Sequence, residues 1–115
     1  MKKPLAAFPL IAYHSAPPGV HYAQSVGETC LVMEDELIVP GAKYERVPMG
    51  DVGAVHHEHE SVIVIDAVTY HFALRCRSQN ERDQLAFVIA YVAHCNLYTE
   101  NGLADMKALE RKYLD

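Results

Sequence analysis

The sequence has little that would mark a nucleic-acid-binding or membrane protein. Basic residues are outnumbered, with 10 Lys and Arg against 15 Asp and Glu, which gives a formal net charge of -5. Nucleic-acid-binding domains usually carry a basic excess or stripe, and anionic membrane surfaces attract basic segments, so we expect neither partner. No stretch approaches the roughly 20 apolar residues that span a bilayer. A protein or a small molecule is the expected partner.

Cysteine is also scarce. Cys30, Cys76 and Cys95 are the three in the chain, and no C-x-x-C motif is present. A secreted disulfide framework would need an even and denser set. Lys2-Lys3 and the apolar run after them are similar to a signal peptide, but prolines break the run and Pro17-Pro18 follows it. These features favour reduced thiols and a cytoplasmic location.

The length and composition indicate a single domain. The chain has 115 residues, of which half are apolar and 22% are charged, as in an ordinary globular protein. Residues 1–27 contain four of the six prolines, so we expect them to form an arm packed on the domain. Residues 28–98 are expected to form a β-meander followed by a helix, and residues 99–115 a short C-terminal helix.

From residue 28 the apolar positions follow the period of β-strands, with turn residues every 8 to 12 positions. This spacing is typical of an antiparallel meander. The clearest hairpin spans residues 61–75, where a two-residue loop at Asp66-Ala67 would pair Ile65 with Val68. Type I′ turns prefer Asp-Gly to Asp-Ala, so a register shifted by one residue stays open.

The sequence Ser78-Gln79-Asn80-Glu81 matches a capping box and predicts the start of a helix over residues 78–98. Asn101-Gly102 is its expected end, because glycine readily adopts the left-handed conformation. A second helix is expected over 103–114. The core positions that these patterns predict are Leu31, Leu37, Val39, Ile63, Ile65, Tyr70, Phe72, Leu74, Leu85, Ile89 and Val92.

The longer helix is apolar on several faces, which is unusual for a helix that is half exposed to water. Phe87, Tyr91 and His94 lie away from its core stripe. Either the N-terminal arm or a second subunit is expected to cover them. We therefore predict that these three residues form an interface, with a homodimer as the simplest assembly.

The layout resembles the bacterial pleckstrin-homology-like (PH-like) domains. The resemblance rests on residues 35–41, on residues 44–55, and on the strand of residues 68–74 that leads into Ser78-Gln79-Asn80-Glu81-Arg82. It covers about residues 28–97. It implies an α+β fold in which an antiparallel β-meander, a partly open barrel, is capped by a C-terminal helix. It also implies a non-catalytic binding or assembly scaffold.

The histidines offer an alternative. Seven are present, and three stand together in His56-His57-Glu58-His59-Glu60. On a strand, His57 and His59 would project to one side, and the hairpin register places His57 opposite Cys76. Two imidazoles and a thiolate could hold Zn²⁺ with one position open. Histidines near strand ends also commonly lie half-exposed at loops, so surface histidines without a metal remain the other interpretation.

No pattern in the sequence predicts a catalytic residue. His94 and Cys95 are adjacent helical positions that point about 100° apart, so the imidazole is poorly placed to activate the thiol. We therefore predict a non-enzymatic protein-interaction or assembly domain that self-associates, without a cofactor. The alternatives are a metal- or small-ligand-binding protein that uses His57, His59 and Cys76, and a small acidic regulator or inhibitor of a larger complex.

Overall fold

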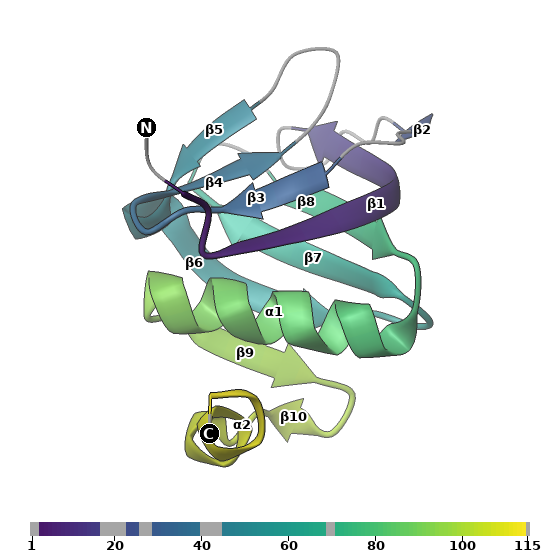
Figure 1. Cartoon of the computed structure of the whole chain (residues 1–115). Coiled ribbons are helices and arrows are strands. Elements are labelled where there is room, and N and C mark those ends of the chain that lie inside the picture. The colour runs from purple at the N-terminus through teal and green to yellow at the C-terminus, as the bar shows by residue number, and fades with distance from the viewer. Residues whose placement is uncertain (1–2, 17–22, 26–28, 40–44, 69–70, 115) are drawn as a thin grey trace.

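The computed structural model describes residues 3–16, 23–25, 29–39, 45–68 and 71–114. Its fold is α+β (Figure 1). The first elements in chain order are β1 (Ala6–Ala16), β2 (Ala23–Ser25), β3 (Thr29–Val32), β4 (Glu36–Val39), β5 (Glu45–Pro48), the 3₁₀ turn η1 (Met49–Asp51) and β6 (Val52–His57). They are followed by β7 (Val62–Ala67), β8 (His71–Cys76), α1 (Gln79–Ala93), β9 (Asn96–Thr99), β10 (Gly102–Leu103) and α2 (Met106–Tyr113).

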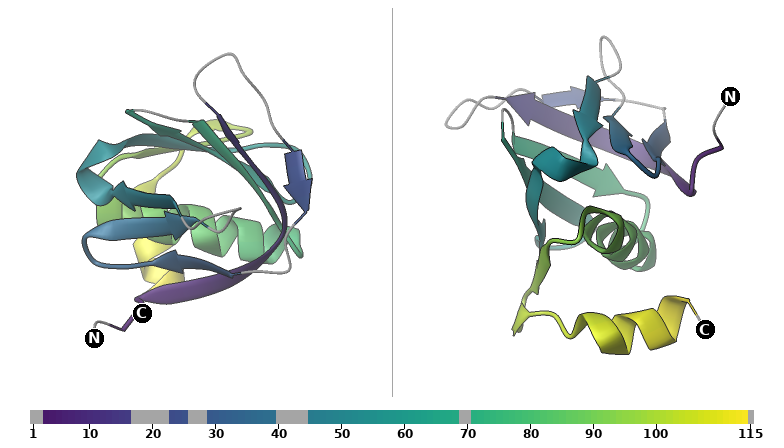
Figure 2. Two further views of the ribbon diagram at one scale, coloured as in Figure 1. Left: turned by 90° about the horizontal axis from the view of Figure 1, so that it is seen from above. Right: turned by 90° about the vertical axis from the view of Figure 1, so that its left-hand side faces the viewer.

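The strands in the described ranges form one curled sheet with the order β10-β9-β6-β7-β8-β1-β3-β4-β5, and β2 pairs with β1 off this path. The predicted α+β class, with a helix after the strands and a short helix at the C-terminus, is confirmed. Neighbouring strands are antiparallel except β6 and β9, which are parallel. The sheet curves over α1, and α2 lies on the other side of that helix (Figure 2). Neither helix of the described part is long and apolar enough to cross a membrane.

The segment predicted to be an arm contributes a strand to the interior of the sheet. β1 lies between β3 and β8, with Phe8 paired to Cys30 and Leu10 paired to Cys76. Pro9 pairs with Thr29 at the end of the β1–β3 ladder, and the β1–β8 register shifts just beyond it. Proline is tolerated in strands at such positions because few ladder hydrogen bonds are lost.

The β7–β8 hairpin has a different register from the predicted one. Ile63 pairs with Leu74, Ile65 pairs with Phe72, and Asp66 and His71 form the last pair before the loop. The loop is therefore longer than two residues, in line with the absence of an Asp-Gly turn. The shift is an even number of residues, so each side chain keeps the face predicted for it.

The start of α1 is confirmed, but its end is not. The Ser78 hydroxyl accepts a hydrogen bond from the Glu81 amide at 3.1 Å, as in a capping box. The helix ends at His94, which adopts a left-handed φ of 56°. The predicted continuation to residue 98 is wrong, because Leu97 lies in β9 and pairs with Val55 of β6. Gly102, with φ of 102°, serves the β9–β10 turn instead of ending the helix.

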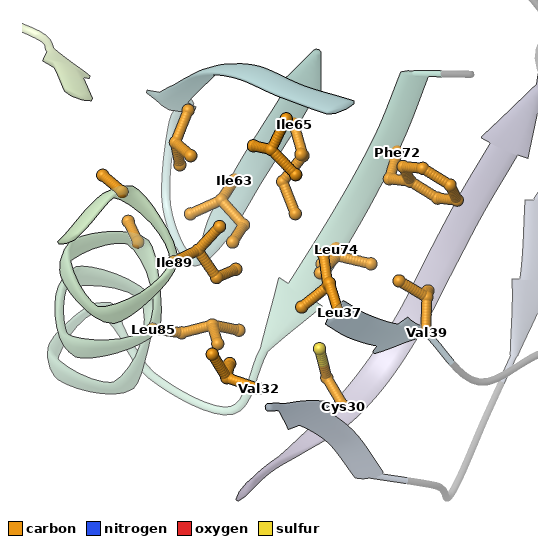
Figure 3. Packing of buried hydrophobic residues seen from close by; sticks show 14 of the residues in the cluster. Cys30, Val32, Leu37, Val39, Ile63, Ile65, Phe72, Leu74, Leu85 and Ile89 are labelled. Atoms are coloured by element: carbon orange, nitrogen blue, oxygen red, sulfur yellow. The ribbon is translucent and has the colours of Figure 1, made fainter. Parts of the chain in front are cut away.

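The core lies between the sheet and α1 (Figure 3). Most of the predicted core positions are confirmed as buried, namely Leu37, Val39, Ile63, Ile65, Phe72, Leu74, Leu85 and Ile89. Leu31 is intermediate, and Val92 packs against the core while partly buried. Tyr70 lies outside the described residues. The cluster also includes Leu10 and Leu97, so β1 and β9 contribute to the same core.

One buried charge joins the start of α1 to two turns. The side chain of Arg82 is 6% exposed. Its Nη1 donates to the backbone carbonyl oxygens of Glu58, at 2.6 Å, and Glu60, at 2.8 Å, both in the β6–β7 turn. It also donates to the Glu100 carboxylate at 3.2 Å, and Nε donates to Asp83 at 2.9 Å. The guanidinium thus holds the β6–β7 and β9–β10 turns against the helix.

We expect Phe72→Ala to destabilise the fold by about 3–5 kcal/mol, because it removes a buried ring and leaves a cavity. Val68→Ala is the control, because Val68 is 76% exposed, and we expect it to change stability by less than about 0.5 kcal/mol. Urea denaturation followed by circular dichroism measures both. Equal stability of the two variants would contradict the packing described here.

We expect Arg82→Met to cost about 1–3 kcal/mol for each turn carbonyl that it leaves without a donor. The control is Arg75→Met, since Arg75 is 45% exposed and its nitrogen lies 3.9 Å from Glu60. An exposed pair of this kind is worth about 0–1 kcal/mol. The same denaturation experiment compares them, and a loss no larger for Arg82→Met than for Arg75→Met would refute its role.

Candidate functional site

Of the three predicted interface residues, Phe87 is inside the protein. It is 1% exposed, and its ring packs against those of Tyr91, at 5.6 Å between centroids, and Tyr113, at 5.2 Å. Tyr113 belongs to α2, which therefore covers this part of α1. The prediction that Phe87 faces a partner is wrong, because its own chain buries it.

Tyr91 and His94, the other two predicted interface residues, are exposed and line a common groove. The groove runs along the C-terminal part of α1 and has a volume of about 840 Å³. Leu5, before β1, and Met106 of α2 contribute apolar surface, and Tyr91 is 41% exposed. We call this concavity the α1–α2 groove.

The charge of the α1–α2 groove is acidic. Its lining includes the carboxylates of Glu34, between β3 and β4, and Glu110, on α2. His94 also lines it, and no Lys or Arg does among the described residues. The groove therefore combines an apolar surface with two negative charges, which favours a partner that carries apolar and basic side chains.

His57 lies on the other side of α2 from this groove, at the end of β6. Its side chain is 10% exposed, and Nε2 is buried without a hydrogen-bond partner among the residues that the structure describes. The nearest acidic oxygen is Oδ1 of Asp83, at 3.7 Å, which is too long for a hydrogen bond. Burial lowers the pKa of His57, and this effect outweighs the opposing one of the Asp83 carboxylate. The imidazole is therefore neutral near pH 7.

The three predicted zinc ligands are not brought together. His57 pairs with Ile63 rather than lying opposite Cys76, His59 is exposed in the β6–β7 turn, and Cys76 is buried on β8. Among the residues that the structure describes, no group of three or more His, Cys, Asp or Glu side chains could hold a metal ion. The predicted zinc site depended on a β7–β8 register that the structure does not have.

The buried thiols are poor nucleophiles. Burial raises the pKa of Cys76 to about 11 and also raises the pKa of Cys30 far above its usual range. Both thiols are therefore protonated at neutral pH, whereas the thiolate is the reactive form.

A second histidine cluster, on the outer face of the sheet, was not foreseen. Nε2 of His56 lies 2.8 Å from Oδ2 of Asp66, and Nε2 of His71 lies 3.6 Å from the other oxygen of that carboxylate. The His56 ring stacks on Tyr98, with 5.1 Å between centroids. The prediction placed Asp66 in the hairpin loop, so its carboxylate was not expected beside these strands. Only the correct hairpin register could have revealed the cluster.

No family model matches the chain, and no curated protein matches it. The geometry and charge of the residues described above are therefore what indicates the function.

The buried His57 predicts a dependence of stability on pH. Its pKa is lower in the folded protein than the 6.5 of an unperturbed histidine, so the unfolded chain binds more protons as the pH falls below that value. We expect the wild type to lose stability from about pH 7 to about pH 5, and His57→Gln to lose less. His59→Gln, at an exposed histidine, is the control and should behave like the wild type. Urea denaturation at each pH measures this, and identical pH profiles of wild type and His57→Gln would exclude the effect.

Proposed function

We propose that this protein is a non-catalytic interaction domain that docks a segment of a partner protein into the α1–α2 groove. The observation that carries the proposal is Tyr91, a large aromatic side chain that stays 41% exposed inside an apolar concavity with carboxylates at its edge. Exposed aromatic residues in concave apolar surfaces are common anchors of protein interfaces. The partner residue that fits beside Tyr91 is apolar.

Charge selects the kind of partner segment. Glu34 and Glu110 line the groove, and the whole chain carries a formal charge of -5. A segment that combines apolar residues with Lys or Arg would therefore be attracted and oriented. A small acidic regulator that captures a basic region of a larger complex is one biological form of this proposal.

Self-association is less well supported than it was from the sequence. The predicted homodimer relied on an uncovered face with Phe87 and Tyr91, and α2 covers Phe87 while Tyr91 stays exposed. In a two-fold dimer the same patch meets itself, so two grooves that each carry Glu34 and Glu110 would bring four like charges into one interface. The homodimer is kept as the alternative to a separate partner, and the experiment below distinguishes the two.

Two further predictions accompany the proposal. We place the protein in the cytoplasm, a placement supported by its three unpaired cysteines, two of which are buried in the core. The PH-like resemblance stays a prediction. It supports a scaffold role, although β9, β10 and α2 extend the chain beyond the single closing helix of that layout.

The test is selection of short peptides from a random library on the immobilised full chain, followed by affinity measurement on purified peptides. We expect enriched peptides to combine Leu, Phe or Trp with Lys or Arg. Tyr91→Ser should cost about 2 kcal/mol or more of binding free energy, as at interface anchors. Glu34→Lys combined with Glu110→Lys should shift the selection towards acidic peptides. Ile11→Ser is the matched control, since Ile11 is 48% exposed and does not line the groove.

Other outcomes would overturn the proposal. Peptides that bind Tyr91→Ser and Ile11→Ser equally well would place the interface elsewhere. Sedimentation of the wild type gives the oligomeric state, and we expect a monomer of 12.9 kDa. A dimer that Tyr91→Glu dissociates would show that a second copy, and not a separate partner, occupies the groove.

A further inference from the structure

A second concavity lies on the outer face of the sheet, over β3, β4 and β5. It has a volume of about 530 Å³, which is within the usual range of binding pockets. Leu31, Met33 and Ile38 contribute its apolar lining, and Pro4, before β1, borders it. We call it the β3–β5 pocket.

The apolar lining of this pocket is unusual for the outer face of a sheet. Antiparallel sheets normally carry apolar residues on the core face and polar residues on the face towards water. Val32 and Leu37 are fully buried in the core. Their strand neighbours Leu31 and Ile38 therefore point outwards, where they pair with each other across β3 and β4. An outward apolar pair inside a concavity indicates a surface that another molecule covers.

The β3–β5 pocket adjoins the α1–α2 groove. Leu5 lines the groove, whereas its neighbour Pro4 lines the pocket. In the same way Glu34 lines the groove, whereas Asp35 lines the pocket. The two concavities are therefore separated by a single ridge, which consists of the β3–β4 turn and the chain just before β1.

Backbone hydrogen bonds hold this ridge in place. The amide of Met33 donates to the carbonyl oxygen of Glu36 at 2.8 Å and closes the β3–β4 turn. The amide of Met49, in η1, donates to the carbonyl oxygen of Asp35 at 2.9 Å. A surface that is already ordered loses little conformational entropy when a partner binds to it.

The ridge and both concavities are acidic. Glu34 and Glu110 line the groove, and Asp35 and Glu36 line the pocket. Among the described residues, Arg46 is the one Lys or Arg in the two linings, and it pairs with Glu36. Glu34 and Asp35 are both exposed at the ridge. A segment that crosses the ridge is therefore attracted when it carries Lys or Arg at the crossing.

We propose that the β3–β5 pocket is a second subsite for the same partner segment, an inference that rests on the docking function proposed for the α1–α2 groove. The segment carries two apolar anchors, one beside Tyr91 in the groove and one against Leu31 in the pocket. Lys or Arg lies between the anchors, above Glu34 and Asp35. Two anchors on one chain bind more tightly than either alone, because the second binds at a high effective concentration.

The test selects 14-residue peptides from a random library on the immobilised full chain. At roughly 3.3 Å per residue such a peptide reaches about 46 Å, more than the 36 Å of the longest dimension of the protein. Each enriched peptide is then divided into halves, and the groove half is the one whose binding Tyr91→Ser weakens. We expect the whole peptide to bind at least about tenfold more tightly than its groove half.

Variants at the pocket separate this subsite from the groove. Leu31→Thr shortens the apolar lining but keeps a residue that favours strands. It should remove most of the tenfold gain of the whole peptide and leave the affinity of the groove half unchanged. Pro4→Lys places a positive charge at an exposed edge of the pocket, should act in the same direction, and decides the matter if Leu31→Thr is unstable. Val68→Lys is the matched control, since Val68 is 76% exposed and lines neither concavity.

The location of the second anchor is read from ¹H–¹⁵N spectra of the full chain. The whole peptide should shift the amides of Leu31 and Ile38, and the groove half should leave them in place.

Three results would overturn the proposal. One is a whole peptide that binds no more tightly than its groove half. The second is a gain in affinity that Leu31→Thr and Pro4→Lys leave unchanged. The third is a whole peptide that does not shift the amides of Leu31 and Ile38. In each case the groove half can still bind and depend on Tyr91, so the docking proposal stands, whereas the absence of any peptide that depends on Tyr91 ends both proposals.

Discussion

The arrangement of the turns around the start of α1 depends on the guanidinium of Arg82. A buried arginine is costly unless each of its donors finds an acceptor, and here the acceptors come from three separate parts of the chain. Two are backbone carbonyls of the β6–β7 turn, one is the Glu100 side chain before β10, and one is the neighbouring Asp83. Glu60 has a positive φ of 58° in the turn that Arg82 holds. The contact with Glu100 holds the β9–β10 turn beside the first turn of α1.

The second constraint is the apolar character of α1 on nearly all its faces. The curled sheet covers Leu85 and Ile89, and α2 covers Phe87 on the other side. A short helix suffices because one aromatic ring, that of Tyr113, reaches across to the Phe87 ring. What remains uncovered is the C-terminal part of α1 around Tyr91, and this remainder is the groove. The exposed apolar surface of α1 is thus smaller than its sequence suggested, and it is concave rather than flat.

Local signals in the sequence predicted local structure well. The Ser78 cap, the buried faces of β7 and β8 and the existence of two helices all follow from short-range periodicity and side-chain chemistry. The end of α1 was not predictable in this way, because His94 adopts a conformation that usually indicates glycine. Leu97 adopts a strand conformation because it pairs in parallel with Val55, which is far from it in the sequence.

The candidate sites were harder to predict for the same reason. His57 was identified by its place in a histidine cluster, but the side chain expected opposite it was Cys76 on β8, whereas the acidic side chain near it, Asp83, lies on α1. Asp83, Leu109 and Tyr113 carry no motif and meet only because the chain turns back twice after α1. Tyr91 and His94 were found because an exposed apolar stripe is visible in the sequence itself. Contacts between elements far apart in the chain need the register, which one sequence does not supply.

The position of α2 has a thermodynamic consequence. Met106 and Glu110 line the α1–α2 groove, whereas Leu109 and Tyr113 line another concavity, beside His57. One short helix thus forms a wall of both concavities. α2 has no fully buried residue of its own, but Tyr113 covers Phe87 and Leu109 packs against the core. A molecule on one side that displaces this helix must alter affinity on the other, and linkage requires the effect to be the same in both directions. Any displacement of α2 by a ligand in one concavity would therefore couple that concavity to the other.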